Sequence, residues 1–248
     1  MMTITIFPLQ GFPLINPGDN LEQILVSELQ KIDLVDNDIL VIAHTIISKA
    51  ENRVYNLSEM IPSSFAQSIG IFQEKDPRKI EVILQESQEI IRMNNRVLIT
   101  ETKHGFICAN SGVDKSNTPG ETVIGLPTDP DLSAQRIKDK VLADLGKNVA
   151  VIISDTFGRP FRIGTVNVAI GVAGINPIED LRGQTDLFGY ELVSTIVAKV
   201  DEVAAAAGLV MGQSNEGTPV IIVRGVKYTP SDAPATILIR DPQSDVFR

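Results

Sequence analysis

The stretch VAVIISDTFGRPFRIG, residues 149–164, decides how this chain folds and where its chemistry lies. Its first five residues are apolar and predict a buried strand, which is followed by Asp155 and Thr156, by a turn with glycine, and by Arg159 and Arg162. A carboxylate at the end of a buried strand is costly without a partner, and a divalent cation is a natural partner for it. Arginines suit phosphates and carboxylates. The stretch predicts half of a metal–phosphate site, unless Asp155 only caps the following turn.

Outward from this stretch, segments with the periodicity of strands and segments with the periodicity of helices follow one another without strict alternation. Strands are predicted at residues 3–7, 38–43, 97–100, 106–109, 149–153, 166–174, 219–224 and 237–239. Helices are predicted at residues 21–29, 76–91, 132–145 and 191–210, and a polar loop at 110–130. This order predicts a mixed α+β fold in a single domain, residues 1–248, with no linker. Neither GxxxxGK[ST] nor GxGxxG occurs, so the fold is predicted to be neither a P-loop nor a Rossmann fold.

The composition excludes several functional classes. The net charge of −9 argues against a nucleic-acid partner. One cysteine and two histidines exclude an intrachain disulfide and a zinc site built on Cys or His, so a bound metal should have oxygen ligands, which favours Mg or Mn. The N-terminus lacks the pattern of a signal peptide, and no apolar run is long enough to span a bilayer. We therefore expect a cytoplasmic protein without a membrane partner.

Three further segments could complete the site. Asp114 and Asn117 lie in a glycine-containing loop, although such residues are also common in surface turns. The segment 211–219, MGQSNEGTP, could wrap phosphates with its backbone amides or could be an ordinary connection. Lys49 follows a buried strand and could reach a phosphate, or could begin a solvated helix.

Together these segments resemble a known family. The motifs FPLQGFPLI at residues 7–15, TIISKAE at 45–51, NSGVDKSN at 110–117, ISDTFGRPFR at 153–162 and MGQ at 211–213 occur in the order and spacing of the coenzyme F-420-0:gamma-glutamyl ligases. The similarity spans nearly the whole chain and extends to the terminal DVFR. The resemblance implies a family-specific fold of two intertwined α/β subdomains and a homodimer.

The same resemblance implies a GTP-dependent amide ligase that adds L-glutamate to the lactyl carboxylate of coenzyme F-420-0, with further gamma-linked glutamates in many members. It implies two Mg or Mn ions, with potassium as an additional activator. Asp114 and Asp155 match ligands of one ion, Thr156 matches a ligand of the second, and Gln213 stands where some relatives have a glutamate. A neutral amide is the weaker ligand, so either the second site is weaker or Glu216 contributes.

The positions that match nucleotide contacts in the family are Phe12, Pro13, Leu14, Ile15, His44, Thr45, Lys49, Asn117, Met211, Gly212, Gln213, Ser214, Asn215, Glu216, Gly217 and Thr218. Activation of the carboxylate as an acyl phosphate would fit this chemistry, with Lys49, Arg159 or Arg162 offsetting negative charge. No side chain stands out as the general base for the glutamate amine. Three alternatives remain open: another carboxylate acceptor, a non-catalytic nucleotide- or metal-binding homologue, and a globular protein whose acidic loops are only turns.

Overall fold

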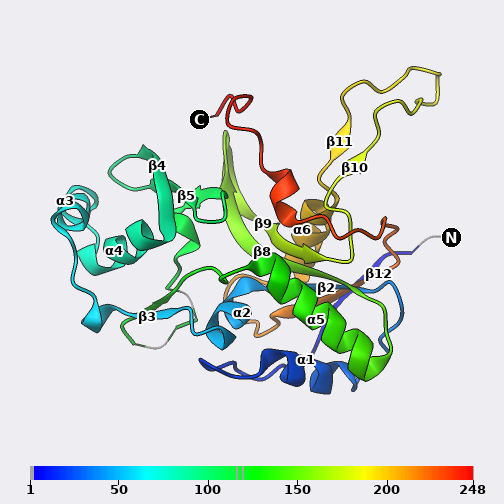
Figure 1. Cartoon of the computed structure of the whole chain (residues 1–248), viewed down its shortest axis with the longest axis horizontal. Coiled ribbons are helices and arrows are strands. Elements are labelled where there is room, and N and C mark those ends of the chain that lie inside the picture. The colour runs from blue at the N-terminus through cyan, green and yellow to red at the C-terminus, as the bar shows by residue number, and fades with distance from the viewer. Residues whose placement is uncertain (1–2, 116, 119, 248) are drawn as a thin grey trace.

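A five-stranded mixed sheet lies at the centre of the molecule (Figure 1). The computed structural model describes residues 3–115, 117–118 and 120–247. The strands follow the order β1 (Thr5–Pro8), β12 (Val220–Arg224), β2 (Ile39–Ala43), β8 (Ala150–Arg159) and β9 (Arg162–Ala173). β2 and β8 run parallel, whereas the other neighbouring strands run antiparallel.

Helices cover both faces of this sheet. α1 (Leu21–Leu29) and α5 (Pro130–Leu145) pack on one face, and α6 (Lys199–Met211) packs on the other. In β2, Leu40 and Ile42 join the first core, while Ile39 and Val41 join the second. A strand buried on both faces reads as a continuous apolar run, which is why the sequence pattern found it. The short helix α2 (His44–Ala50) follows β2 directly.

A second lobe is built from the chain between α2 and α5 (Figure 1). It has its own apolar core, to which α3, α4 and β5 contribute. Its elements are β3 (Val54–Asn56), η1 (Leu57–Glu59), α3 (Ser64–Gln73), α4 (Pro77–Glu86), β4 (Ser87–Met93), β5 (Leu98–Thr102), β6 (Ile107–Ala109), η2 (Asn110–Gly112) and β7 (Thr122–Ile124). The division of the chain into one domain of two intertwined subdomains remains a prediction.

A hairpin arm projects from the body between β9 and α6 (Figure 1). Its base is the pair β10 (Glu179–Asp180) and β11 (Ile196–Val197). After β12, the chain forms the 3-10 helix η3 (Ala235–Leu238), and its C-terminal segment then runs beside β9. No helix among the described residues is both long and apolar enough to cross a membrane.

The mixed α+β class is confirmed, and several predicted elements recur almost unchanged. α1 occupies the predicted residues, with the Asn20 side chain accepting a hydrogen bond at its N-terminus. α5 ends at Gly146, which has a left-handed φ of 65° and so suits the position after a helix. The strand pair at β5 and β6 was also predicted.

Three predicted boundaries and one predicted strand are wrong for identifiable reasons. β8 does not end at residue 153 but continues to Arg159, because it pairs with β9 across a register shift after Ile153. The helix predicted at 76–91 ends at Glu86, since residues 87–93 pair with β5 instead. The helix predicted at 191–210 begins only at Lys199, after a segment rich in β-branched residues. Residues 237–239 do not form a strand, because the short apolar run there ends the turn of η3.

Other elements were not anticipated, and α3 and β7 are two examples. α3 was not predicted at all, and its exposed side includes Phe65 and Phe72. The loop predicted at 110–130 contains β7, which pairs with β3. Both elements depend on pairing or packing between distant segments, which a local pattern does not record.

Candidate active site

A cleft of about 610 Å³ lies where the central sheet meets the second lobe. Six separated parts of the chain line it, and they include all the positions that match nucleotide contacts in the resembled family. Those lining residues are Phe12, Pro13, Leu14, Ile15, His44, Thr45, Lys49, Asn117 and each residue from Met211 through Thr218. Asp114, Asp155 and Thr156 line the same cleft. The structure thus gathers into one cavity segments that are separated by up to about two hundred residues.

The parallel pairing of β2 with β8 explains why two of these segments meet. Ala43 pairs with Ser154, so the residues that follow, His44 and Asp155, emerge side by side at the same end of the sheet. His44 Nε2 lies 3.3 Å from Asp155 Oδ1, with these side chains only 5% and 13% exposed. Ligand sites commonly form where the carboxyl ends of parallel strands meet.

His44 interacts with the carboxylates of the cleft, a role that the sequence did not indicate. Burial lowers the pKa of His44, but the charge and hydrogen bond of Asp155 together with the charge of Asp114 raise it by more, so its pKa lies above its usual value. Its Nδ1 lies 3.4 Å from Ser48 Oγ. Because both carboxylates act on this one imidazole, they share one electrostatic environment.

Asp114 reaches the cleft through an unusual turn. Asn110, Ser111 and Gly112 have successive positive φ values of 56°, 53° and 69°. A side chain at Gly112 would meet Leu126 at 2.6 Å, so this close approach requires glycine. Beyond the turn, Asp114 and Ile124 exchange backbone hydrogen bonds of 2.9 and 2.8 Å. This bridge fixes the backbone from which the carboxylate projects.

Thr156 and Gln213 contact each other next to Asn167, a residue that the sequence analysis did not single out. Thr156 Oγ1 lies 3.1 Å from Gln213 Oε1, and Gln213 Nε2 donates to Asn167 Oδ1 at 2.9 Å. Asn167 is buried in β9, among residues that are mostly apolar. One buried amide in an otherwise apolar strand is costly without partners, and that signal could have revealed it.

Glu216 is turned toward its own loop. Its Oε2 accepts a hydrogen bond from the Ser214 backbone at 2.8 Å. Backbone hydrogen bonds, first that of Ser214, lower the pKa of Glu216. Gly212 has a φ of 75°, a left-handed backbone conformation that favours glycine at this position of the loop. Glu216 therefore stabilises the loop, and Gln213 is the residue that contacts Thr156.

The positively charged side chains that the sequence predicted for the site lie in two places. Lys49 lines the cleft, and burial lowers its pKa. Arg159 and Arg162 lie at the far end of the β8–β9 hairpin and do not line the cleft. Arg159 Nη2 instead donates to the Ile163 carbonyl at 3.4 Å. A charge-offsetting role for these arginines is thus not supported by their position in the described part of the chain.

The donors of the cleft fit a hard divalent cation that arrives with phosphate groups. Asp114 and Asp155 offer carboxylates, and Thr156 and Gln213 offer neutral oxygens. Ser154 Oγ and Asn110 Oδ1 are buried polar atoms without a hydrogen-bond partner, and both residues line the cleft. Within the described ranges, no cluster of three or more His, Cys, Asp or Glu is arranged to hold a metal. Magnesium is commonly held by one or two carboxylates, with substrate phosphates completing its shell.

Comparisons with known proteins show the family of the chain. The profile of the F420-0:Gamma-glutamyl ligase family matches residues 11–225. The Coenzyme F420:L-glutamate ligase of Methanothermobacter thermautotrophicus is 47% identical to the chain, with 100% of both chains covered. The proteins of that name from Methanopyrus kandleri and Methanocaldococcus jannaschii are 45% and 48% identical, covering 99% and 92% of this chain and 98% and 91% of their own.

A mixed α+β fold that gathers these polar segments into one cleft, together with such relatives, defines an enzyme of the ligase class. More specifically, the chain belongs to the F420-0:gamma-glutamyl ligase family.

Proposed function

We propose that this protein is a GTP-dependent ligase that joins L-glutamate to the lactyl carboxylate of coenzyme F-420-0 and adds further gamma-linked glutamates. The observation that carries the proposal is the convergence of Asp114, Asp155, Thr156 and the loop 211–218 on one cleft. A cavity of about 610 Å³ is within the usual range for a nucleotide-sized ligand. Family membership supports the acceptor and the amino acid.

Two Mg or Mn ions would be held by this chain's oxygen donors, with potassium as an additional activator. Asp114 and Asp155 would hold one ion, and Thr156 with Gln213 would contribute to the second. When bound, such ions neutralise charge on the phosphate oxygens. Asn167 would orient the Gln213 amide, because it accepts the hydrogen bond from Gln213 Nε2.

The reaction must first activate a carboxylate, whose oxygen is a poor leaving group. In the proposed reaction, the acceptor carboxylate oxygen attacks the terminal phosphorus of GTP, the bond to the β-phosphate oxygen breaks, GDP leaves, and the carboxylate becomes an acyl phosphate. The glutamate amine then attacks the acyl carbon, the amide bond forms, and phosphate leaves with the bonding electrons while the amine loses a proton. The protein positions these groups, and Lys49 supplies a positive charge on the wall of the cleft.

Phosphate release tests the proposal directly. We expect release from GTP only when both L-glutamate and coenzyme F-420-0 are present. Phosphate release when one of the two substrates is missing, or no release when both are present, would contradict the proposal. A calorimetric titration with Mn and GTP adds a readout that does not depend on turnover, since a non-catalytic homologue would still bind the nucleotide.

Gln213→Glu is expected to tighten the second metal site, because a carboxylate is a better ligand than an amide for a hard cation. We expect Mn affinity to increase by about tenfold, a change of about 1.4 kcal/mol in binding free energy. A Mn titration of the GTP complex measures it. Gln67→Glu is the matched control, since it makes the same substitution at an exposed position of α3 outside both pockets. Unchanged or weaker Mn binding by Gln213→Glu would exclude Gln213 as a ligand.

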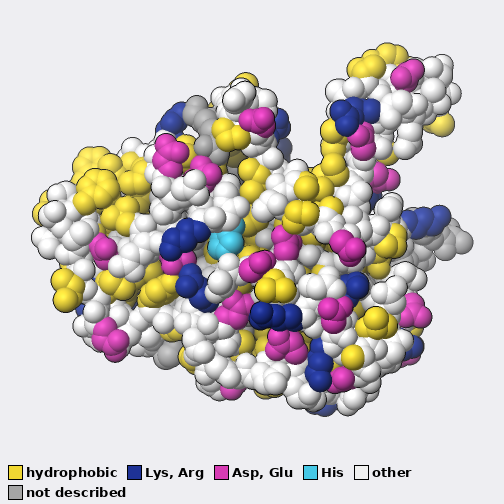
Figure 2. All heavy atoms as spheres, in the orientation of Figure 1, with side chains coloured by type: hydrophobic (Ala, Val, Ile, Leu, Met, Phe, Trp, Pro, Cys, Tyr) yellow, Lys and Arg dark blue, Asp and Glu magenta, His cyan; other side chains and the backbone are white. Residues whose placement is uncertain are grey.

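We also propose that the protein is a homodimer and that the hairpin arm takes part in the interface. Leu187 and Phe188 at the arm are 99% and 96% exposed, and Figure 2 shows apolar side chains on the arm as it stands away from the body. Large exposed apolar side chains on a projection commonly mark an interaction surface. The Leu187→Ser/Phe188→Ser double variant should therefore be monomeric in light scattering, whereas Leu209→Ser on α6 should remain dimeric. A dimeric double variant would exclude the arm.

A further inference from the structure

A second pocket, of about 220 Å³, lies next to the cleft. Its walls come from β6, the β8–β9 hairpin, α6 and the C-terminal segment. They are formed by Gly105, Phe106, Ile107, Phe157, Val168, Ala169, Asp201, Leu238, Ile239, Arg240 and Asp245. No residue of this set was singled out by the sequence analysis.

The second pocket and the cleft share a wall. Phe157 lines both of them. In the β8–β9 ladder, Asp155 pairs with Val168, so a residue of the cleft stands directly opposite a residue of the second pocket. Residues paired in this way have Cα atoms about 4.5–5.5 Å apart. A small molecule in the second pocket would therefore lie beside the part of the cleft that contains Asp155.

The charged residues that line the second pocket are Arg240, Asp201 and Asp245, and the rest of its wall is apolar. Arg240 is exposed and has no hydrogen bond or ion pair among the residues that the structure describes. Asp201 is half-buried, and its Oδ1 accepts a hydrogen bond from the Ala169 backbone at 2.9 Å. Burial raises the pKa of Asp201. Phe106 and Phe157 meet edge to face, with ring centroids 6.5 Å apart.

We propose that the second pocket binds the amino-acid substrate, with a carboxylate at Arg240, the ammonium group at Asp201 and the methylene carbons on the apolar wall. A guanidinium is the preferred partner of a carboxylate, and a carboxylate that retains acceptor capacity suits an ammonium group. The pocket is about a third the volume of the cleft, which fits an amino acid rather than a ring-bearing acceptor. This assignment rests on the proposed function, because it identifies where that reaction takes its amine.

Calorimetry of L-glutamate binding in the presence of Mn and GDP tests the assignment without turnover. We expect the wild-type protein to bind L-glutamate, and Arg240→Gln and Asp201→Asn each to weaken binding by about tenfold or more, the loss of one charged contact. Asn at position 201 retains an acceptor for the Ala169 amide. Arg136→Gln is the matched control, because Arg136 is exposed on α5 and lies in neither pocket.

Steady-state kinetics show which substrate the Arg240 variant affects. Arg240→Gln should raise the KM for L-glutamate while leaving the KM values for GTP and the acceptor within about twofold of wild type. Unchanged glutamate affinity in Arg240→Gln, or a rise in the acceptor KM alone, would overturn the assignment. If wild type binds L-glutamate and Arg240→Gln loses it, yet coenzyme F-420-0 triggers no phosphate release, the proposed function fails while the pocket assignment stands.

Discussion

Asp155→Asn is expected to abolish ligation almost completely. The variant keeps an oxygen to accept the Thr156 backbone hydrogen bond, which is 2.6 Å in the native protein, but loses the charge that a divalent cation requires. We expect kcat/KM to fall by about 10²–10³-fold, or about 3–4 kcal/mol in the transition state. Steady-state phosphate release measures this loss.

Two observations keep this prediction separate from a folding defect. The melting temperature and the circular dichroism spectrum of Asp155→Asn should remain close to those of wild type. Asp232→Asn is the matched control, because Asp232 is exposed and lies in neither pocket. Near-normal turnover by Asp155→Asn would exclude this carboxylate as a metal ligand.

Glu86→Ala is expected to cause the largest loss of stability. Glu86 is 7% exposed, accepts a hydrogen bond from the Tyr55 hydroxyl at 2.6 Å, and pairs with Arg53, which also donates to the Leu126 carbonyl. These contacts join β3 to α4 within the second lobe. Removing one partner of a buried ion pair leaves the other uncompensated, which costs about 3 kcal/mol. For a chain of this size the melting temperature should fall by roughly 6–12 °C.

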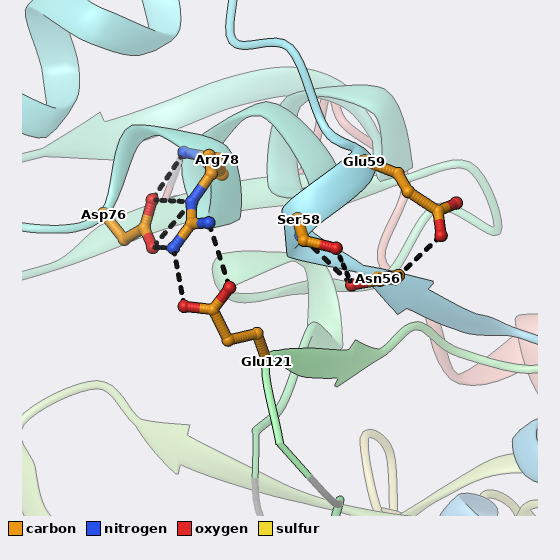
Figure 3. A network of polar contacts seen from close by, with 6 residues as sticks. All are labelled: Asn56, Ser58, Glu59, Asp76, Arg78 and Glu121. Atoms are coloured by element: carbon orange, nitrogen blue, oxygen red, sulfur yellow. Dashed lines mark hydrogen bonds and ion pairs between the residues drawn. The ribbon is translucent and has the colours of Figure 1, made fainter.

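A surface ion pair of the same lobe provides the control. Figure 3 shows Arg78 held between Asp76 and Glu121. Glu121 is 59% exposed, so Glu121→Ala should change the melting temperature little, because solvent screens such pairs. If Glu86→Ala melts no lower than Glu121→Ala, the buried pair does not stabilise the second lobe.

Tyr55 gives this prediction a spectroscopic readout. Burial first, and then the hydrogen bond and charge of Glu86, raise the pKa of Tyr55 to about 12. Glu86→Gln removes the charge but leaves the burial, so the Tyr55 pKa should decrease toward the ordinary tyrosine value near 10. Ultraviolet titration of the phenol absorbance measures the change.

The sequence predicted those elements whose local pattern records their burial. β2 and β12 read as continuous apolar runs because both faces of each are covered, and α5 was recognisable from its spacing and its terminal glycine. The position of Asp155 beside a cleft was predicted from the cost of placing a carboxylate after a buried run. The loops that join it there were recognised from motifs.

Long-range pairing accounts for what the sequence did not predict. The extension of β8 past Asp155 depends on its ladder with β9, and the end of α4 at Glu86 depends on the pairing of β4 with β5. Asn167 enters the site because the same ladder places it opposite Thr156. Arg240 reaches the second pocket only through the path of the C-terminal segment. Apart from the amide of Asn167 in its mostly apolar strand, these contacts have no signature within a few residues of the chain.

Mass spectrometry of the products formed from GTP, L-glutamate and coenzyme F-420-0 tests the central claim most directly. The proposal predicts GDP, phosphate, and a coenzyme product heavier by one or more glutamyl residues, formed only with a divalent cation. An unmodified coenzyme, recovered from protein that binds Mn and GTP, would contradict the claim.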